Sequence, residues 1–367
     1  MSDEERGWSD PVVAFAPGRV NLIGEHTDYT GGYAMPIAIQ LGTRVTYTTD
    51  RTSPIVELSS SWESAPASVP LSIPEDSAQI EALLPEWSRY VAGVVAALRP
   101  PAGGKGEIVS DLPIGAGLSS SASLELALAL ALGFRGDPVG LALFGQRAEH
   151  LASGVATGLL DQLAIACGID GHAMLLDCHS NEIDQVPLAR EIDLVVVHCG
   201  VPRTVVGSGY SERLEQCRAA EREIGPLRVA TSEDVEQIQD PLLRRRARHV
   251  VSENARVLEF AGALRQEDMR QAGLLMNESH RSLSVDYEVS LPELDALVRW
   301  LQGAPGVLGA RMTGAGFGGC AVAMTRPGAL TGMLDHRRHW VVRAADGARL
   351  VTRDRAAPSV CGRTRRR

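Results

Sequence analysis

The chain has 367 residues and a mass of 39.2 kDa, enough for two domains that each bury a hydrophobic core. Its net charge of −9 argues against nucleic acid or an anionic membrane as a partner. The acidic first ten residues are unlike a secretory signal, the longest apolar run is too short to span a bilayer, and the six cysteines lack the spacing of a zinc site. We therefore expect a cytoplasmic protein that binds neither nucleic acid nor a membrane.

A short strand and an unusually polar loop open the chain. Residues 12–15 are an apolar run typical of a strand, and the next stretch, residues 18–32, carries Arg19, Glu25, His26 and Asp28. Carboxylates accept hydrogen bonds from sugar hydroxyls and a guanidinium donates them, so this loop suits a small polyhydroxylated ligand. Taken singly, each side chain could equally be a solvated surface charge, and no third residue stands at a spacing that completes a metal site.

The next segments predict strands, a loop and a helix. Residues 34–48 alternate apolar and polar side chains, as strands do, and residues 53–77 are rich in Ser and Pro, which predicts a surface loop or an irregular hairpin. Trp87 and Tyr90 follow at helical spacing. An aromatic pair at this spacing usually belongs to the core.

Residues 112–125 hold the pattern around which the chain is organised. Gly115 and Gly117 permit backbone angles that other residues resist, and a cluster of three serines precedes a helical run, residues 122–132. Such a cluster is an N-terminal capping signal. Unpaired amides, spare hydroxyls and the helix dipole together favour an anion, most usefully a triphosphate. The alternative is a turn that merely caps a core helix, and the loop is not a Walker A motif, because no Gly-Lys-Ser/Thr follows it.

Further along, the sequence predicts a second helix over residues 138–153 and a long helix over residues 242–267. Asp161 precedes another apolar helix, where it could be only an N-cap. The polar stretch between the apolar runs 173–176 and 192–198 is the candidate domain junction. We therefore assign the domains to residues 1–188 and 189–352, and we expect the arginine-rich residues 353–367 to be a disordered tail.

Three motifs resemble one enzyme family. Residues 18–29 are similar, nearly letter for letter, to the galactokinase signature. Residues 112–125 resemble the phosphate loop of the wider family of galactokinase, homoserine kinase, mevalonate kinase and phosphomevalonate kinase, and residues 311–320 resemble its third, glycine-rich motif. The resemblance implies a two-domain α+β fold, with a ribosomal-protein-S5-like N-terminal kinase domain, a ferredoxin-like C-terminal domain and the active site between them.

The resemblance also implies an activity and its residues. The activity is that of a galactokinase of the Leloir pathway, which phosphorylates the anomeric C1 hydroxyl of D-galactose with ATP. Asp161 would be the catalytic base, and the sugar would be bound by Glu25, His26, Asp28, Gly158 and Tyr210. The nucleotide would be bound by Gly115, Ala116, Gly117, Leu118, Ser119, Ser120 and Ser121, with Trp87 and Tyr90 beside the adenine. Mg²⁺ would be held by Glu149 and a serine, Ser121 first and Ser120 second.

The chemistry of phosphoryl transfer fits these assignments. The reaction depends mostly on positioning and on neutralising charge. Mg²⁺ needs one or two protein oxygens when phosphates and water complete its coordination. Asp161 could accept or position the proton of the sugar hydroxyl, and Arg19 beside it would keep the carboxylate ionised and shield the developing charge.

Two other functions stay open. One is a related sugar 1-kinase that acts on N-acetylgalactosamine, galacturonate or arabinose. The other is a non-catalytic galactose sensor, which lacks a Ser-Ala pair in its phosphate loop, whereas this chain has Ser121-Ala122. We expect the protein to be a monomer.

Overall fold

The computed structural model describes residues 9–351, except for 114, 155–157 and 203–207. The arginine-rich segment 353–367 therefore lies outside the described residues, and so does the prediction that it is a disordered tail. In the part of the chain that is described, no helix is both long enough and apolar enough to cross a membrane.

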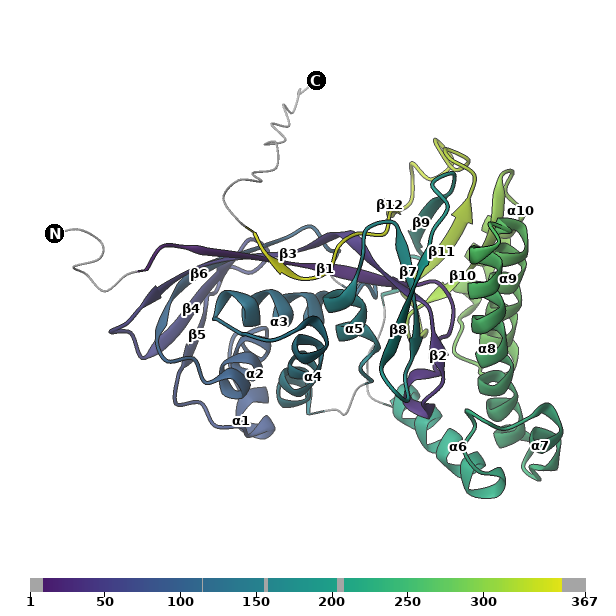
Figure 1. Cartoon of the computed structure of the whole chain (residues 1–367), viewed down its shortest axis with the longest axis horizontal. Coiled ribbons are helices and arrows are strands. Elements are labelled where there is room, and N and C mark those ends of the chain that lie inside the picture. The colour runs from purple at the N-terminus through teal and green to yellow at the C-terminus, as the bar shows by residue number, and fades with distance from the viewer. Residues whose placement is uncertain (1–8, 114, 155–157, 203–207, 352–367) are drawn as a thin grey trace.

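A six-stranded sheet with helices on one face forms the first half of the molecule (Figure 1). Its strands follow the order β13 (Arg349–Leu350), β1 (Val12–Asn21), β3 (Pro36–Asp50), β6 (Gly103–Ser110), β4 (Ile55–Ser60) and β5 (Ala67–Pro70). All neighbours are antiparallel except the parallel pair β4 and β6. The helices are α1 to α5, namely Ser77–Glu81, Ser88–Leu98, Ser120–Ala131, Pro138–Ser153 and Leu160–Cys167. Helix α3 is buried on nearly every side, so it is the centre of this half.

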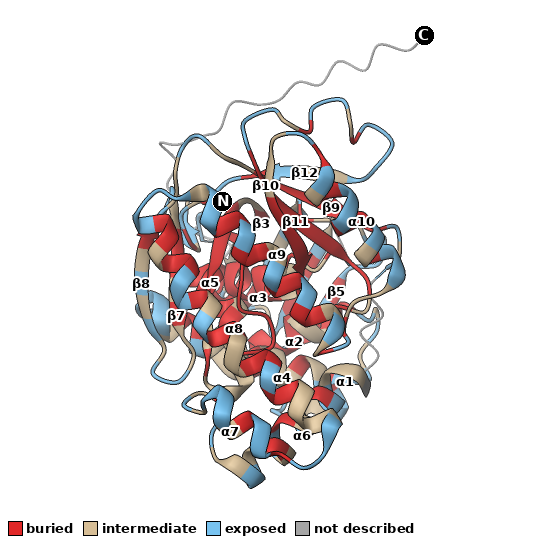
Figure 2. Ribbon diagram, turned by 90° about the vertical axis from the view of Figure 1, so that its right-hand side faces the viewer, coloured by how far each residue is buried: buried red, intermediate tan, exposed pale blue. Residues whose placement is uncertain are grey.

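A four-stranded antiparallel sheet forms the second half. Its order is β10-β11-β9-β12, namely Val307–Thr313, Cys320–Thr325, Asp193–His198 and His339–Val342. Helices α9 and α10, Met269–Val285 and Pro292–Gly303, pack on this sheet, and α8, Pro241–Arg265, packs on α9. Helices α6 and α7, Ser208–Ile224 and Ser232–Gln237, lie against one end of α8 (Figure 1). Figure 2 shows the buried residues gathered along β9 and β11 and along α3.

The two halves share a sheet and a core. A three-stranded sheet, β2-β7-β8, stands between them, namely Tyr33–Ala34, His172–Asp177 and Glu182–Pro187. One buried cluster joins Val20 and Leu118 of the first half to Val257, Met276 and Val322 of the second. Strand β13 returns from the second half to pair with β1. The predicted division at residues 188 and 189 stays a prediction.

Strand β1 is longer than the sequence predicts. The predicted strand over residues 12–15 continues to Asn21, because a register shift between Pro17 and Arg19 lets it pass a proline that has no N–H to donate. Gly18 is required at the shift, since a Cβ there would stand 2.7 Å from the carbonyl oxygen of Leu118. The strand therefore runs directly against the phosphate loop and delivers Arg19 to it.

The segment over residues 53–77 forms a hairpin, one of the two alternatives that the sequence predicts for it. Strands β4 and β5 are its arms. The turn between them carries Trp62, which packs on the core of the first half. The centroids of the Trp62 and Trp87 rings lie 6.5 Å apart. The hairpin is therefore anchored by an aromatic contact.

Candidate active site

The phosphate loop ends at α3, where Ser119 is the N-cap residue. Ser119 has left-handed backbone angles, φ 59° and ψ 50°, and its side chain makes no capping hydrogen bond. The predicted capping by a serine side chain is therefore wrong at this residue, because the Ser119 hydroxyl donates to Asp161 Oδ2 at 2.5 Å instead. Gly115 and Gly117 both have positive φ, 73° and 77°, as the predicted tight loop requires.

Arg19 ties the loop to Asp161. Its Nε and Nη2 atoms lie 2.7 and 2.6 Å from Asp161 Oδ1, and its Nη1 donates to the carbonyl oxygen of Gly117 at 2.6 Å. Asp161 lies in the first turn of α5, where the helix dipole stabilises a carboxylate. It is not the N-cap, which is Leu159. The three contacts fix the carboxylate at the edge of the phosphate loop.

Glu149 lies next to this group, near the end of α4. Its Oε1 accepts a hydrogen bond from Ser121 at 3.0 Å, and its Oε2 accepts one from Gln162. Burial, with a smaller effect from Asp161, raises the pKa of Glu149 to about 7. A carboxylate and a hydroxyl that face each other in this way match the one or two oxygens that Mg²⁺ takes from protein. Among the described residues, no three or more His, Cys, Asp or Glu side chains form a metal cluster of their own.

A further acid near Glu149 was missed by the sequence reasoning. Glu125, one helical turn after Ser121 on α3, is fully buried, and its carboxyl oxygens have no hydrogen-bond partner among the described residues. Burial first, and then Glu149, raises its pKa well above the usual range. The sequence does contain a signal for it, because a charged residue between Leu124 and Leu126 interrupts an apolar helical run.

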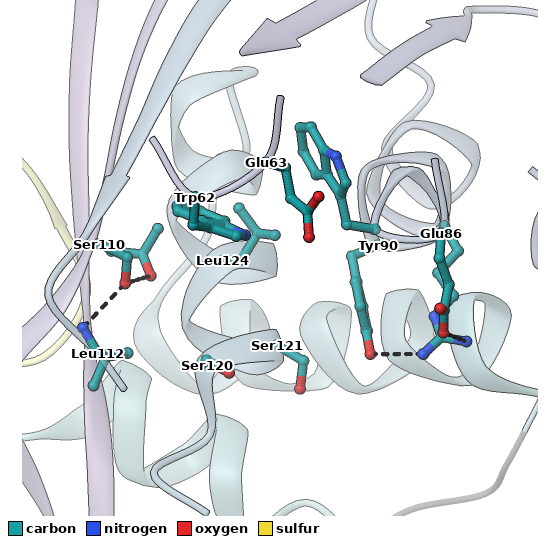
Figure 3. Close-up of a pocket in the computed structure, with 12 residues that line it drawn as sticks. Trp62, Glu63, Glu86, Tyr90, Ser110, Leu112, Ser120, Ser121 and Leu124 are labelled. Carbon is teal, nitrogen blue, oxygen red and sulfur yellow. Dashed lines mark hydrogen bonds and ion pairs between the residues drawn. The ribbon is translucent and has the colours of Figure 1, made fainter. Parts of the chain in front are cut away.

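A cavity of about 310 Å³ opens beside α3 (Figure 3). Ser120 and Ser121 line it at the phosphate loop, and Trp87 and Tyr90 line it at the start of α2. The Trp87 indole N–H donates to the carbonyl oxygen of Ala65 at 3.2 Å, which fixes the ring. The structure thus brings both predicted adenine residues into one cavity with two predicted phosphate ligands. Two further lining residues, Trp62 and Glu63, were missed because they belong to the Ser- and Pro-rich hairpin.

Glu25 of the polar loop is held by the second half of the molecule. Its Oε1 accepts from the Gly314 N–H at 2.7 Å, from the Thr313 hydroxyl at 3.4 Å and from Arg311 Nη1 at 3.5 Å. Arg311 is fully buried. Because the donors from the described residues approach Oε1, Oε2 is the oxygen that this arrangement leaves for a ligand.

Glu253 of α8 holds the same loop through a hydrogen bond to its backbone. It is fully buried and its Oε1 accepts from the Gly24 N–H at 3.0 Å. Although burial alone would raise its pKa, Arg256, His249 and Arg311 lower the pKa of Glu253 to about 2. The loop is therefore attached to an ionised carboxylate of the second half.

Asp28 and Gly158 lie in contact. A Cβ at Gly158 would stand 2.1 Å from Asp28 Oδ2, so the carboxylate rests on the bare Cα. Desolvation, followed by the nearby Asp161, raises the pKa of Asp28 to about 6. The two predicted sugar-binding residues thus adjoin the predicted base.

His26 and Tyr210 lie together on the other side of the loop, with ring centroids 6.0 Å apart. The His26 ring nitrogens are hydrogen-bonded within the protein, Nδ1 to the Tyr29 hydroxyl at 3.0 Å and Nε2 to the Ala315 carbonyl oxygen at 3.1 Å. Tyr210 lies near the start of α6, its ring 5.2 Å from that of Tyr29.

Comparisons with known proteins agree with this geometry. Residues 4–49 match the family model described as the galactokinase galactose-binding signature. Residues 89–169 match the GHMP kinases N terminal domain, and residues 260–333 match the GHMP kinases C terminal model. The chain is 40% identical to the galactokinase of Homo sapiens, an alignment that covers 95% of this chain and 94% of that protein. It is 43% identical to the galactokinase of Roseiflexus, over 85% of this chain and 83% of that protein.

Among solved structures, the galactokinase of Lactococcus lactis complexed with galactose matches with a TM-score of 0.86 and 33% identity, over 94% of this chain and 96% of that chain. The mevalonate kinase of Methanococcus jannaschii, at 19% identity and a TM-score of 0.69 over 91% of this chain and 98% of that chain, shares the fold. These matches confirm the predicted α+β fold with an N-terminal and a C-terminal domain.

Proposed function

Because the chain belongs to the galactokinase family of the GHMP kinases, we propose that it transfers the γ-phosphate of ATP to the C1 hydroxyl of D-galactose. The products would be galactose 1-phosphate and ADP, in the Leloir pathway. The observation that carries the proposal is the position of Asp161. It is hydrogen-bonded to the phosphate loop through Ser119 and lies close enough to Asp28 of the polar loop to raise its pKa.

In this proposal Asp161 acts on the sugar hydroxyl. Both Arg19 contacts go to Oδ1, so Oδ2, which accepts only from the Ser119 hydroxyl among the described residues, is the oxygen that can receive the sugar proton. Arg19 keeps positive charge beside the carboxylate and at the loop, where negative charge develops during transfer.

ATP would lie along the cavity beside α3. The adenine would meet Trp87 and Tyr90, and the phosphates would meet the loop formed by Gly115, Ala116, Gly117, Leu118, Ser119, Ser120 and Ser121. Glu149 and Ser121, with Ser120 as the second candidate, would hold Mg²⁺. When bound, this ion neutralises charge on the β- and γ-phosphates.

The sugar would be bound between Asp161 and the second half of the molecule. Glu25 and Asp28 would accept from its hydroxyls, the contact between Asp28 and Gly158 would define one wall, and Tyr210 another. A site built on such acceptors rejects an epimer that leaves a buried carboxylate without its donor, by up to ~10⁴-fold. The preference for galactose over glucose, which differs at the C4 hydroxyl, would follow from these contacts.

The protein's partners would be small molecules only. The net charge of −9 favours a protein that binds neither nucleic acid nor an anionic membrane. We expect a cytoplasmic monomer.

An assay of ADP release across monosaccharides, run with and without Mg²⁺, tests the proposal. Galactose should give rapid, Mg²⁺-dependent turnover, and glucose little or none. Faster turnover of N-acetylgalactosamine, galacturonate or arabinose would identify a related sugar 1-kinase. Galactose binding by calorimetry without any turnover would identify a sensor.

A further inference from the structure

A chain of hydrogen bonds leads from α6 to His26 in the polar loop. Cys217 Sγ lies 3.2 Å from the Tyr287 hydroxyl, which makes a short contact with the Tyr29 hydroxyl. The Tyr29 hydroxyl in turn lies 3.0 Å from His26 Nδ1. It ends where His26 Nε2 meets the carbonyl oxygen of Ala315, 3.1 Å. Cys217 and Tyr287 are fully buried, and His26 is 4% exposed.

The last acceptor determines where the protons lie. A carbonyl oxygen can only accept, so the bond to Ala315 requires the proton of His26 on Nε2. In a neutral ring Nδ1 then accepts, and Tyr29 must donate to it. The oxygen of Tyr29 in turn accepts from Tyr287, whose oxygen accepts from the thiol of Cys217.

The two tyrosines of this hydrogen-bond chain keep their protons. Burial raises the pKa of Tyr29 and of Tyr287 well above 10, so both remain donors. The ring centroid of His26 lies 4.9 Å from that of Tyr287 and 5.9 Å from that of Tyr29.

His26 occupies a strained turn. Its φ is +64°, an uncommon angle for a residue with a Cβ, and it costs on the order of 1 kcal/mol or more. The turn separates Glu25 from Asp28, the two proposed sugar-binding carboxylates. A ring that is fixed at both nitrogens therefore fixes the spacing of these two groups.

We propose that Tyr29, Tyr287 and Cys217 are positioning residues for galactose, and that they act through the His26 ring. The side chain of His26 then serves the site by holding the turn, with Nε2 bound to the glycine-rich loop and Nδ1 bound to the relay. This inference rests on the proposed function, since it assigns Glu25 and Asp28 to the sugar.

Tyrosine-to-phenylalanine variants test the relay, because they remove one hydroxyl and keep the ring. Tyr29→Phe leaves Nδ1 without its donor and should raise the KM for galactose ~10-fold, with the KM for ATP unchanged, since an unpaired buried group costs roughly 1–3 kcal/mol. Tyr287→Phe, one step farther away, should raise it severalfold. Tyr47→Phe is the matched control, because Tyr47 is buried in the first half and its hydroxyl has no partner among the described residues.

The ¹⁵N spectrum of the histidine side chains gives a readout that a merely structural role would not move. His26, assigned by the signal lost in His26→Gln, should show a protonated Nε2 and a bare Nδ1, and the Nδ1 signal should shift in Tyr29→Phe. A His26 protonated on both nitrogens, or a folded Tyr29→Phe with an unchanged galactose KM, would overturn the relay. Equal increases in both KM values with a lowered melting temperature would also overturn it. If the unaltered protein failed to phosphorylate galactose, the proposed function would fail instead.

Discussion

The phosphate loop and residues 24–32 of the polar loop are held by different parts of the molecule. The polar partners of the phosphate loop, Arg19, Glu149 and Asp161, all come from the first half of the molecule. The polar loop lies early in the sequence, yet donors more than 200 residues away hold it, among them Arg311 and Gly314. The polar contacts of the nucleotide side therefore lie within the first half, whereas those of the sugar side require both halves of the molecule.

The largest effect is expected at the residue where these two regions meet. Asp161→Asn keeps the shape of the side chain but removes the charge that Arg19 pairs with and the base that accepts the sugar proton. We expect kcat to fall ~10³-fold, within the range for loss of a general base, while calorimetry still detects both ligands. Near-native turnover in this variant would exclude Asp161 as the base.

A second prediction isolates the nucleotide side. Glu149→Ala removes one hard oxygen and the partner of Ser121, so Mg-ATP should bind on the order of 10- to 100-fold more weakly. Calorimetry of galactose without nucleotide should give an unchanged affinity, because no contact of the polar loop is lost. An unchanged Mg-ATP affinity would leave Glu149 as a buried helix-end charge without a role in metal binding.

What the sequence could predict follows the same division. The phosphate loop was predictable because its glycines, hydroxyls and helix are contiguous, and the predicted helix over residues 138–153 agrees with α4. The contacts of Glu25 gave no local signal, since Arg311 stands 286 residues away. Arg246, in a basic stretch that suggests a solvated helix face, is instead buried and paired with Glu288 at 2.6 Å. Buried polar pairs between distant segments are what periodicity and composition cannot reveal.

A third prediction isolates the sugar side from within the second half. Thr313→Val removes a hydroxyl that reaches the Asn21 carbonyl oxygen at 3.0 Å and Glu25 Oε1 at 3.4 Å, with almost no change in shape. We expect the KM for galactose to rise ~5-fold and the KM for ATP to stay constant, from one lost buried hydrogen bond.

Thr325→Val is the matched control for this variant. Thr325 is as deeply buried, lies on the neighbouring strand β11 and also donates to a backbone carbonyl, but it lies at the far end of that strand from the loop. Equal effects of the two variants on the galactose KM would mean that the second half contributes general stability and not the position of Glu25.

The smallest effect concerns the proton on Asp28. Because desolvation and Asp161 raise its pKa to about 6, the carboxylate is ionised at pH 8 and half protonated at pH 6. At saturating Mg-ATP, the KM for galactose should therefore be about twofold higher at pH 6 than at pH 8.

The raised pKa of Asp28 also predicts how the stability of the fold depends on pH. Above pH 6 the buried Asp28 charge lowers the free energy of unfolding. This penalty disappears as the pH falls towards 3.8, because the native state binds the proton more tightly than the unfolded chain does. Asp28→Asn should therefore raise the free energy of unfolding at pH 7.5 by up to about 3 kcal/mol and at pH 4 by much less, while it weakens galactose binding at both. Denaturant unfolding at the two pH values measures this difference, and equal stabilisation at both would show that the Asp28 carboxylate is solvated and carries no such penalty.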